Sequence, residues 1–272
     1  KRPAFPRRGR QRRHLPSGTA SIIAAALVFG ALLVMVPTRQ RGDAPSLTFV
    51  IDPPVVNGVR QPIGDFALSP DGRTLALVAV SDSGSQVFVR HLAEPNATPV
   101  RGTENASFVA FSPDGQWLGF TTFSGRLLKV RIDESTAPIT LAEGVDSYSG
   151  IAWATDDAIV VGSARPHRPG LGRIAATGGT VRPLTTPREE TSVHGFPYVA
   201  PDRKTLLFTD WGPGFIEDDV LAVGVLESGS FQTTSLRAGR TAGVVDGHVV
   251  YTAGASLMAV PIDSRRARLA GG

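Results

Sequence analysis

The sequence predicts an all-β fold, a β-propeller of four-stranded blades, and three observations support this prediction. One motif recurs five times and is complete in Phe66–Leu77 and Val109–Phe120, where Ser-Pro-Asp-Gly separates two apolar runs. The aspartates of the five copies lie 42 to 46 residues apart, which is the length of one propeller blade, and they are Asp71, Asp114, Asp156, Asp202 and Asp246. Within the copies, apolar residues recur at every second position, which is the period of a β-strand.

Each repeat contains the same order of expected strands. A short apolar strand, such as 66–68, 108–111 or 151–153, runs into the Pro-Asp-Gly turn, whose residues suit a tight hairpin. The second strands are expected at 74–80, 117–122, 158–162, 205–209 and 249–252. The third strands are expected at 86–92, 127–132, 219–226 and 256–262, and more polar fourth strands at 136–141, 180–184 and 231–236.

The two ends of the repeat region predict an incomplete ring. The segment Leu47–Asp52 reads as a strand without inner partners, of the kind that fastens the last blade of a propeller. The fifth repeat stops at Leu269–Gly272, where its outer strand should begin. We therefore expect five visible blades within residues 47–272 and a chain that is part of a longer protein.

The N-terminal segment predicts a membrane anchor. No charged residue occurs from Leu15 to Val36, and about 20 such residues span a bilayer as a helix. Seven basic residues precede this stretch, and by the positive-inside rule they place residues 1–14 in the cytoplasm. The expected order is a basic tail (1–14), a transmembrane helix (15–37), a linker (38–46) and an extracytoplasmic propeller, in a single-pass protein of the inner or plasma membrane.

A cleaved signal peptide is the alternative interpretation of the same segment. Arg12-Arg13 resembles a twin-arginine signal, and an apolar stretch follows it. However, Pro37–Gly42 contains no pair of small residues suitable for cleavage. An uncleaved anchor is therefore favoured.

Charge and composition exclude several function classes. The net charge of +4 comes from residues 1–41, which hold nine basic and no acidic side chains, so the remainder carries 19 basic against 24 acidic residues. A nucleic-acid-binding surface needs clustered Lys and Arg, which the repeat region lacks. With no cysteine in the chain, disulfides and thiolate metal sites are excluded as well.

The blades resemble a known repeat. Ser-Pro-Asp-Gly turns with third strands such as Leu127–Asp133 and Leu257–Asp263 resemble the TolB-like (WD-repeat-like) propeller. The order of basic segment, single membrane helix and propeller resembles bacterial transmembrane serine/threonine protein kinases, in which the propeller is the extracytoplasmic C-terminal part. This resemblance implies a sensor that binds a ligand or protein and favours pairing of neighbouring helices in a homodimer.

No enzymatic activity is expected of this chain itself. A kinase Gly-rich loop, a His-Arg-Asp loop and an Asp-Phe-Gly triplet are all missing from the sequence, so no kinase residue can be assigned. Two alternatives to the kinase-linked sensor stay open. One is the propeller of a prolyl oligopeptidase-like hydrolase without its catalytic domain, and the other is a stand-alone periplasmic interaction propeller.

Several motifs are better explained by turns and loops than by chemistry. Gly170–Ala175 matches a loose dinucleotide-binding pattern but lies where a propeller hairpin loop is expected. Glu217–Asp219 could offer oxygen ligands to calcium, yet it reads as a solvated loop before a strand. The five histidines are scattered along the sequence, so no metal site and no cofactor are predicted.

The expected binding site lies where loops join the second and third strands and where one blade connects to the next. Such loops on a rigid scaffold commonly carry recognition. The segments 165–172 and 211–218 carry more aromatic and charged residues than their counterparts. The candidate ligand- or partner-binding residues are Tyr148, His167, His194, Asp210 and Trp211, and His194 and Trp211 are the first choices for mutation. The partner is an unidentified protein or small molecule, in addition to the bilayer contacted by residues 15–37.

Overall fold

The computed structural model describes residues 54–56, 59–82, 84–133, 136–154, 157–162, 170–189, 191–212, 219–254 and 256–270. The chain divides after Ile51, and all of these residues belong to the second unit, Asp52–Gly272. The predicted tail, transmembrane helix, linker and fastening strand, residues 1–52, lie outside the described residues. Within the described ranges, no helix has the length and apolarity needed to cross a bilayer.

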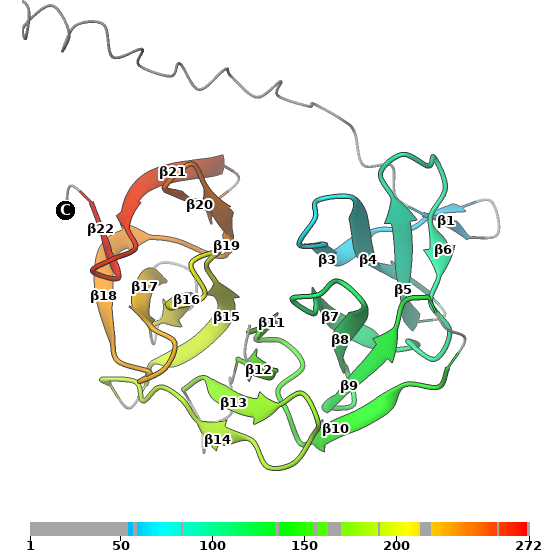
Figure 1. Ribbon diagram of the computed structural model, residues 1–272, viewed down its shortest axis with the longest axis horizontal. Coiled ribbons are helices and arrows are strands. Elements are labelled where there is room, and N and C mark those ends of the chain that lie inside the picture. The colour runs from blue at the N-terminus through cyan, green and yellow to red at the C-terminus, as the bar shows by residue number, and fades with distance from the viewer. Residues whose placement is uncertain are drawn as a thin grey trace, which may run out of the picture. The chain divides into compact units, whose positions relative to one another are not determined.

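The second unit is a five-bladed β-propeller of four-stranded antiparallel blades (Figure 1). Blade 1 consists of β3 (Ile63–Leu68), β4 (Thr74–Ser81), β5 (Gly84–His91) and β6 (Thr98–Pro99). Blade 2 consists of β7 (Ala106–Phe111), β8 (Trp117–Thr122), β9 (Arg126–Arg131) and β10 (Ile139–Glu143). Blade 3 consists of β11 (Ile151–Trp153), β12 (Ala158–Val161), β13 (Gly172–Ala175) and β14 (Arg182–Pro183).

Blade 4 consists of β15 (Val193–Val199), β16 (Thr205–Trp211), β17 (Val220–Val225) and β18 (Phe231–Arg237). Blade 5 consists of β19 (Thr241–Val245), β20 (His248–Ala253), β21 (Ser256–Asp263) and β22 (Arg268–Leu269). In every blade the strands follow chain order from the centre outwards. A separate hairpin of β1 (Val55–Val56) and β2 (Val59–Arg60) precedes blade 1. These sheets confirm the predicted all-β propeller and most of its strand positions.

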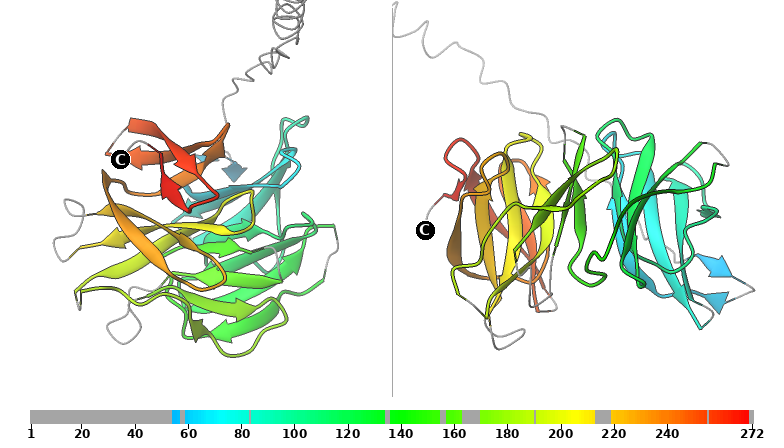
Figure 2. Two further views of the ribbon diagram at one scale, coloured as in Figure 1. Left: turned by 60° about the vertical axis from the view of Figure 1, so that its left-hand side comes forward. Right: turned by 90° about the horizontal axis from the view of Figure 1, so that it is seen from below.

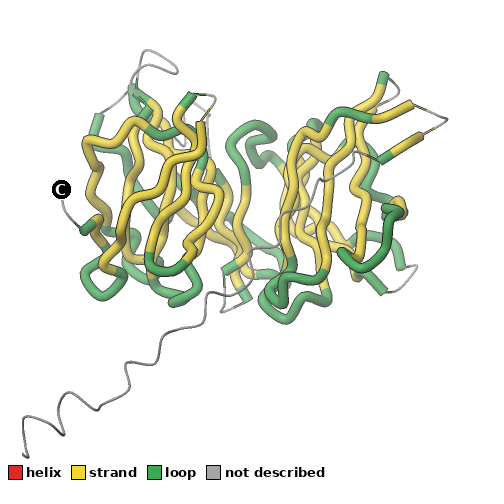
Figure 3. Tube along the Cα trace, turned by 90° about the horizontal axis from the view of Figure 1, so that it is seen from above, coloured by secondary structure: helices red, strands yellow, loops and turns green. Residues whose placement is uncertain are grey.

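The connecting loops gather at two opposite ends of the blades, as Figure 3 shows. One end holds the turns between first and second strands, such as Ser112–Gln116, and we call it the turn end. The other end holds the connections from each outer strand to the next inner strand, such as 144–150, together with the hairpins between second and third strands. We call it the crossover end. Figure 2 shows the same strands running between these two ends.

The repeated motif forms the turn at the turn end, as predicted. In blade 2, the buried Ser112 Oγ donates to Asp114 Oδ1 and accepts from the backbone N–H of Trp117 at 2.9 Å. The same carboxylate accepts from the N–H of Gln116 at 3.0 Å, and Gly115 takes a left-handed φ of 72°. These bonds lower the pKa of Asp114, the hydroxyl of Ser112 being the largest cause. Asp114 is thus a turn residue and not a catalyst.

The core consists of apolar layers between neighbouring blades. Phe120 and Leu118 of blade 2 are fully buried against Ala76 and Val78 of blade 1. Phe208 of blade 4 packs in a second layer with residues of blade 3, and further layers join blades 2 and 3 and blades 4 and 5. Each sheet is therefore covered by the next, and the blades stabilise one another by burying apolar area at ~25 cal/mol per Å².

Two expectations from the sequence need correction. Gly170–Ala175 was expected in a hairpin loop, but Gly172–Ala175 is the third strand of blade 3, where Gly172 lies opposite Val161. The fifth repeat was expected to stop before its outer strand, yet Arg268 and Leu269 pair with β21 as a two-residue strand. Both strands are short, so their sequences carry too few alternating residues to be recognised.

Among the described residues, no strand pairs blade 5 with blade 1, and Figure 1 shows an opening between them. The register places Phe66 opposite Leu77, on the face of blade 1 that does not meet blade 2. Leu257 lies opposite Thr252, on the face of blade 5 that does not meet blade 4. Phe66 is 51% exposed and Leu257 is 69% exposed, so both blades present apolar residues toward the opening.

Candidate functional site

The predicted binding residues within the described part of the chain all belong to the crossover end. Tyr148 lies in the connection between blades 2 and 3. His194 begins the inner strand of blade 4, and Asp210 and Trp211 end the adjacent strand. The structure thus brings His194 and Asp210 together, whereas His167 lies outside the described residues. The ring of Tyr148 contacts the ring of Phe123 instead.

His194 and Asp210 form a buried pair and not a surface loop. They are opposite residues of β15 and β16, and His194 Nε2 lies 3.7 Å from Asp210 Oδ1. The histidine side chain is fully buried, with ring centroids of Phe208 and Phe231 at 4.6 and 4.9 Å. In this structure the His194 side chain is therefore not exposed for direct contact with a ligand. It packs between blades 3 and 4, on the same face as Phe208.

A short hydrogen-bond chain joins His194 to Thr185 and Leu171. Thr185 Oγ1 accepts from the backbone N–H of Leu171 at 2.8 Å and lies 2.7 Å from His194 Nδ1. If the hydroxyl donates to Nδ1, the imidazole proton lies on Nε2, which, like Asp210 Oδ1 at 3.7 Å, has no hydrogen-bond partner among the described residues. Burial lowers the pKa of His194 from 6.5 to about 4 and raises the pKa of Asp210, with desolvation as the largest cause in both. His194 is neutral at pH 7.

Trp211 lies between the His194–Asp210 pair and the centre of the propeller. Its indole meets the ring of Phe196 edge-on, with centroids 5.1 Å apart. Phe196 sits in a bulge of β15 with a φ of 48°, and its N–H donates to the carbonyl of Ser149 at 2.7 Å. The bulge turns the Phe196 ring toward Phe108 of blade 2, at a centroid distance of 6.0 Å. Aromatic rings from blades 2 and 4 thus meet across the centre.

Arg240, in the connection to blade 5, completes this arrangement and is not among the residues predicted from the sequence. Its guanidinium carbon lies 5.9 Å from the centroid of Phe108 and 5.7 Å from that of Phe196, as a cation–π contact with both rings. Its Nη1 donates to Oδ1 of Asp65, on the inner strand of blade 1. Asp65, Phe108, Phe196, Trp211 and Arg240 are called the central cluster from here on.

Asp65 accepts hydrogen bonds from blade 2 and from the connection to blade 5. Its Oδ2 accepts from the backbone N–H of Val109 at 2.9 Å, and only 1% of its side chain is exposed. Burial raises the pKa of Asp65, which Arg240 and the backbone donors oppose. We take the carboxyl as ionised at pH 7, because it accepts hydrogen bonds at both oxygens and a guanidinium contacts it directly.

An aromatic pair stands exposed at the same end. The rings of Tyr148 and Phe123 lie 6.0 Å apart, and Tyr148 is 66% exposed. Asp146 fixes the loop that carries Tyr148, accepting from the Tyr148 N–H at 2.8 Å and from Ser149 Oγ at 2.7 Å. Exposed aromatic side chains on an ordered loop are typical of protein contact sites.

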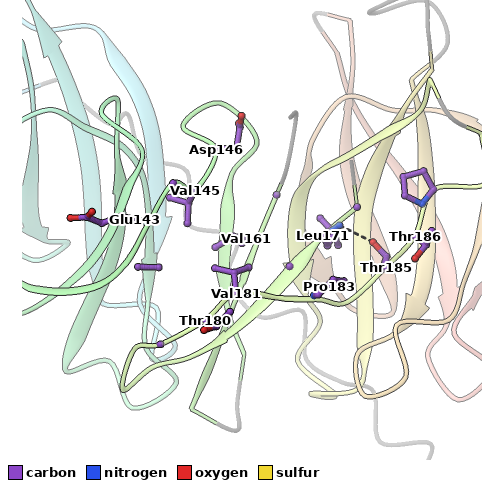
Figure 4. A pocket seen from close by; sticks show the side chains of 17 residues that line it. Glu143, Val145, Asp146, Val161, Leu171, Thr180, Val181, Pro183, Thr185 and Thr186 are labelled. Atoms are coloured by element: carbon purple, nitrogen blue, oxygen red, sulfur yellow. Dashed lines mark hydrogen bonds between the residues drawn. The ribbon is translucent and has the colours of Figure 1, made fainter. Parts of the chain in front are cut away.

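A cavity of about 430 Å³ lies beside the outer strands of blades 2 and 3 (Figure 4). Val145, Val161 and Val181 form apolar walls, and Thr185, which also binds His194, contributes a hydroxyl. Figure 4 shows the carboxylates of Glu143 and Asp146 pointing away from these apolar walls. The volume suits a small ligand. However, the Thr185 hydroxyl is already bonded to Leu171 and His194, so it adds no free polar group.

These groups support binding better than catalysis. The histidine nearest a carboxylate is sealed from solvent, so it cannot take a proton from a bound substrate. In the ranges that the structure describes, no three His, Cys, Asp or Glu side chains group closely enough to hold a metal ion. The accessible polar group with fixed geometry in the central cluster is the guanidinium of Arg240.

Comparison with solved structures shows a TolB-like β-propeller fold. TolB from Acinetobacter baumannii superimposes with a TM-score of 0.58 at 18% identity, over 76% of this chain and 53% of the other. A TolB-like protein from Agrobacterium tumefaciens gives 0.55 at 18% identity, over 62% of this chain and 63% of the other. A chain of a nidogen/laminin complex gives 0.59 at 12% identity, covering 77% and 78%.

The chain thus matches little more than half of one TolB and just under two thirds of the other. No protein-family model matches the sequence. A search of curated proteins likewise gives no match. At these identities the likeness shows the fold alone, a TolB-like β-propeller.

Proposed function

We propose that this propeller is a protein-interaction module that binds its partner at the crossover end, over the central cluster and the Tyr148–Phe123 pair. The observation that carries the proposal is the combination of exposed, ordered aromatic side chains with a partly exposed guanidinium. Aromatic residues and arginine are enriched where proteins bind one another. The similar chain of the nidogen/laminin complex comes from a protein–protein assembly, which supports the same use of the fold.

Site-specific photo-crosslinking in the producing cells tests this proposal. A photoreactive phenylalanine analogue in place of Tyr148 is expected to yield discrete adducts with a partner, and the same analogue in place of Phe123 should capture the same one. The analogue in place of Gln116, at the turn end, is the matched control and should yield none. Adducts of equal yield at position 116, or none at 148 and 123, would refute binding at the crossover end.

We further propose that the propeller acts as the extracytoplasmic sensor of a single-pass membrane protein anchored by residues 15–37. The basic segment, the uncharged stretch and the propeller, in that order, support this arrangement. Partner binding at the crossover end would then favour pairing of neighbouring helices and bring cytoplasmic domains together. Protease treatment of intact spheroplasts is expected to digest the propeller, whereas digestion only after lysis would contradict this topology.

The parent reading frame separates the kinase-linked sensor from its alternatives. Kinase motifs upstream of Lys1 would support a receptor-like serine/threonine kinase. A Gly-x-Ser-x-Gly elbow downstream of Gly272 would instead indicate a prolyl oligopeptidase-like hydrolase, and neither would leave a stand-alone interaction propeller. Purified residues 1–272 are expected to show no ATP-dependent phosphorylation in any of these cases.

A further inference from the structure

We infer that Arg240 is a receptor for one carboxylate group of the bound partner, so that the crossover end selects a protein segment with an acidic side chain or a C-terminal carboxylate. This inference rests on the proposed function and names the chemistry of its partner. Three features of Arg240 support this inference. Its backbone is held by hydrogen bonds, its guanidinium is held by neighbouring residues, and some of its N–H donors have no partner among the described residues.

The backbone of Arg240 is fixed by β20. Its N–H donates to Thr252 Oγ1 at 2.8 Å, and its carbonyl accepts from the N–H of Thr252 at 2.9 Å. The residue before it, Gly239, donates to the carbonyl of Thr252 at 2.8 Å. The arginine therefore projects from a braced turn, and little conformational freedom is lost when it binds.

The guanidinium is fixed in turn by the central cluster. Asp65 accepts from Nη1, and the guanidinium carbon lies within 6 Å of the ring centroids of both Phe108 and Phe196. Asp65 itself is anchored by the N–H of Val109. Contacts from blades 1, 2 and 4 thus orient a side chain that comes from the connection to blade 5.

One edge of the guanidinium remains available. Only Nη1 has a hydrogen-bond partner among the described residues, and 36% of the Arg240 side chain is exposed. Arginine offers five N–H donors in a planar fork, so Nε and Nη2 can still bind an acceptor. A carboxylate matches this fork in size and planarity.

The charge of the site favours a monoanion. Asp65 already contributes one negative charge beside the guanidinium, so a doubly charged phosphate would be repelled by a buried carboxylate that cannot move away. The rings of Phe108 and Phe196 offer apolar surface beside the guanidinium. A partner carboxylate next to an apolar or aromatic group would match both the charge of the guanidinium and the apolar rings of Phe108 and Phe196.

The competing explanation is that Arg240 serves only to neutralise Asp65. The two explanations predict opposite effects for Asp65→Asn. If the pair is only structural, this substitution loosens Arg240 and leaves carboxylate binding absent. If Arg240 is a receptor, removing the competing internal carboxylate leaves its positive charge without a counter-ion and strengthens binding. The backbone of Arg240 stays braced by Thr252, its guanidinium stays beside Phe108 and Phe196, and the amide oxygen at position 65 can still accept from the N–H of Val109.

The probe is 3-phenylpropionate, with neutral 3-phenylpropanamide as its matched control and phenyl phosphate as the phosphate arm, each titrated by ligand-observed NMR. The acid is expected to bind at least about tenfold more tightly than the amide, because a charge-assisted bond is lost in the latter. Arg240→Lys should weaken binding of the acid by about tenfold, whereas Arg237→Lys, an exposed arginine of β18, should leave it unchanged. Asp65→Asn should tighten binding severalfold.

Thermal melts of each variant test whether the fold is retained. The Arg240→Met/Asp65→Asn double variant removes the guanidinium without leaving a buried charge. Equal binding of acid and amide, unchanged binding in the folded double variant, or weaker binding in Asp65→Asn would overturn the inference. Tighter binding of phenyl phosphate than of the acid would overturn it in favour of a phosphate site. If the crosslinks at Tyr148 form but no probe depends on Arg240, the interaction function stands and the carboxylate inference alone fails.

Discussion

The buried His194 predicts a specific pH dependence of stability. In the unfolded chain, His194 takes up a proton near pH 6.5, but in the folded protein burial lowers its pKa to about 4. Between these two values the unfolded state binds more protons than the folded state, so stability must fall as the pH falls. The full difference corresponds to ~3 kcal/mol, and the part lost between pH 7 and pH 5 is ~2 kcal/mol.

The perturbation that isolates this effect is His194→Asn. The amide oxygen of asparagine can still accept from Thr185 Oγ1 but cannot titrate, so the variant should lose the pH dependence even though its stability at pH 7 is lower. Guanidinium unfolding at pH 7 and pH 5 gives the free energy of unfolding of each protein. The wild type is expected to lose ~2 kcal/mol more than the variant over this interval.

Two carboxyl groups act in the opposite direction. Burial raises the pKa of Asp65 and Asp210, so their contribution to stability falls as the pH rises above their unfolded value of 3.8. Because both residues are present in wild type and variant, the comparison cancels most of their effect. His248→Asn, at an exposed residue of β20, provides the matched substitution of a surface histidine. Equal losses in wild type and His194→Asn would refute the reasoning, because His194 would then accept a proton in the folded state with Asp210 as its counter-ion.

Further substitutions test the packing and the polar contacts. Phe120→Ala should lower the free energy of unfolding by ~3–5 kcal/mol because it empties a fully buried site, whereas Phe123→Ala at the surface should change it by less than ~0.5 kcal/mol; urea titration measures both. Ser112→Ala removes the hydroxyl that caps the partly buried backbone N–H of Trp117 at the turn of blade 2 and should cost ~1 kcal/mol in the same titration. Arg240→Met leaves the carboxylate of Asp65 buried without a cation. Because part of the arginine is exposed, the free energy of unfolding should fall by an amount close to the lower end of ~3–5 kcal/mol. Adding Asp65→Asn should restore much of the lost stability in thermal melts. A single Arg240→Met variant as stable as the wild type would show that Asp65 is protonated or hydrated instead.

The fold could be predicted from the sequence because its information is local. Ser-Pro-Asp-Gly places a side-chain-capped turn between two strands, and its recurrence sets the blade length. Blade 3 was the least predictable part, since its copy of the motif has lost the proline and glycine and its strands are only two to four residues long. The strand at Gly172 was therefore interpreted as a loop.

The site could be predicted only in part. Polar residues near strand ends drew attention to His194 and Asp210, but their burial depends on which face of β15 and β16 turns toward blade 3. Arg240 carried no local signal, because the segment Ala238-Gly239-Arg240 resembles an ordinary turn. Its partner Asp65 is 175 residues away, and only the arrangement of the blades around a common centre brings the two together.

That separation of 175 residues also bears on how the protein folds. Contacts between distant parts of a chain carry a large loop-closure entropy and tend to form late. During synthesis from the N-terminus, blade 1 and its carboxylate emerge long before the arginine that neutralises it. The Asp65–Arg240 contact can form only after most of the propeller has left the ribosome. Until then, the inner edge of blade 1 must stay open to water, so folding of the centre awaits the arrival of the connection to blade 5.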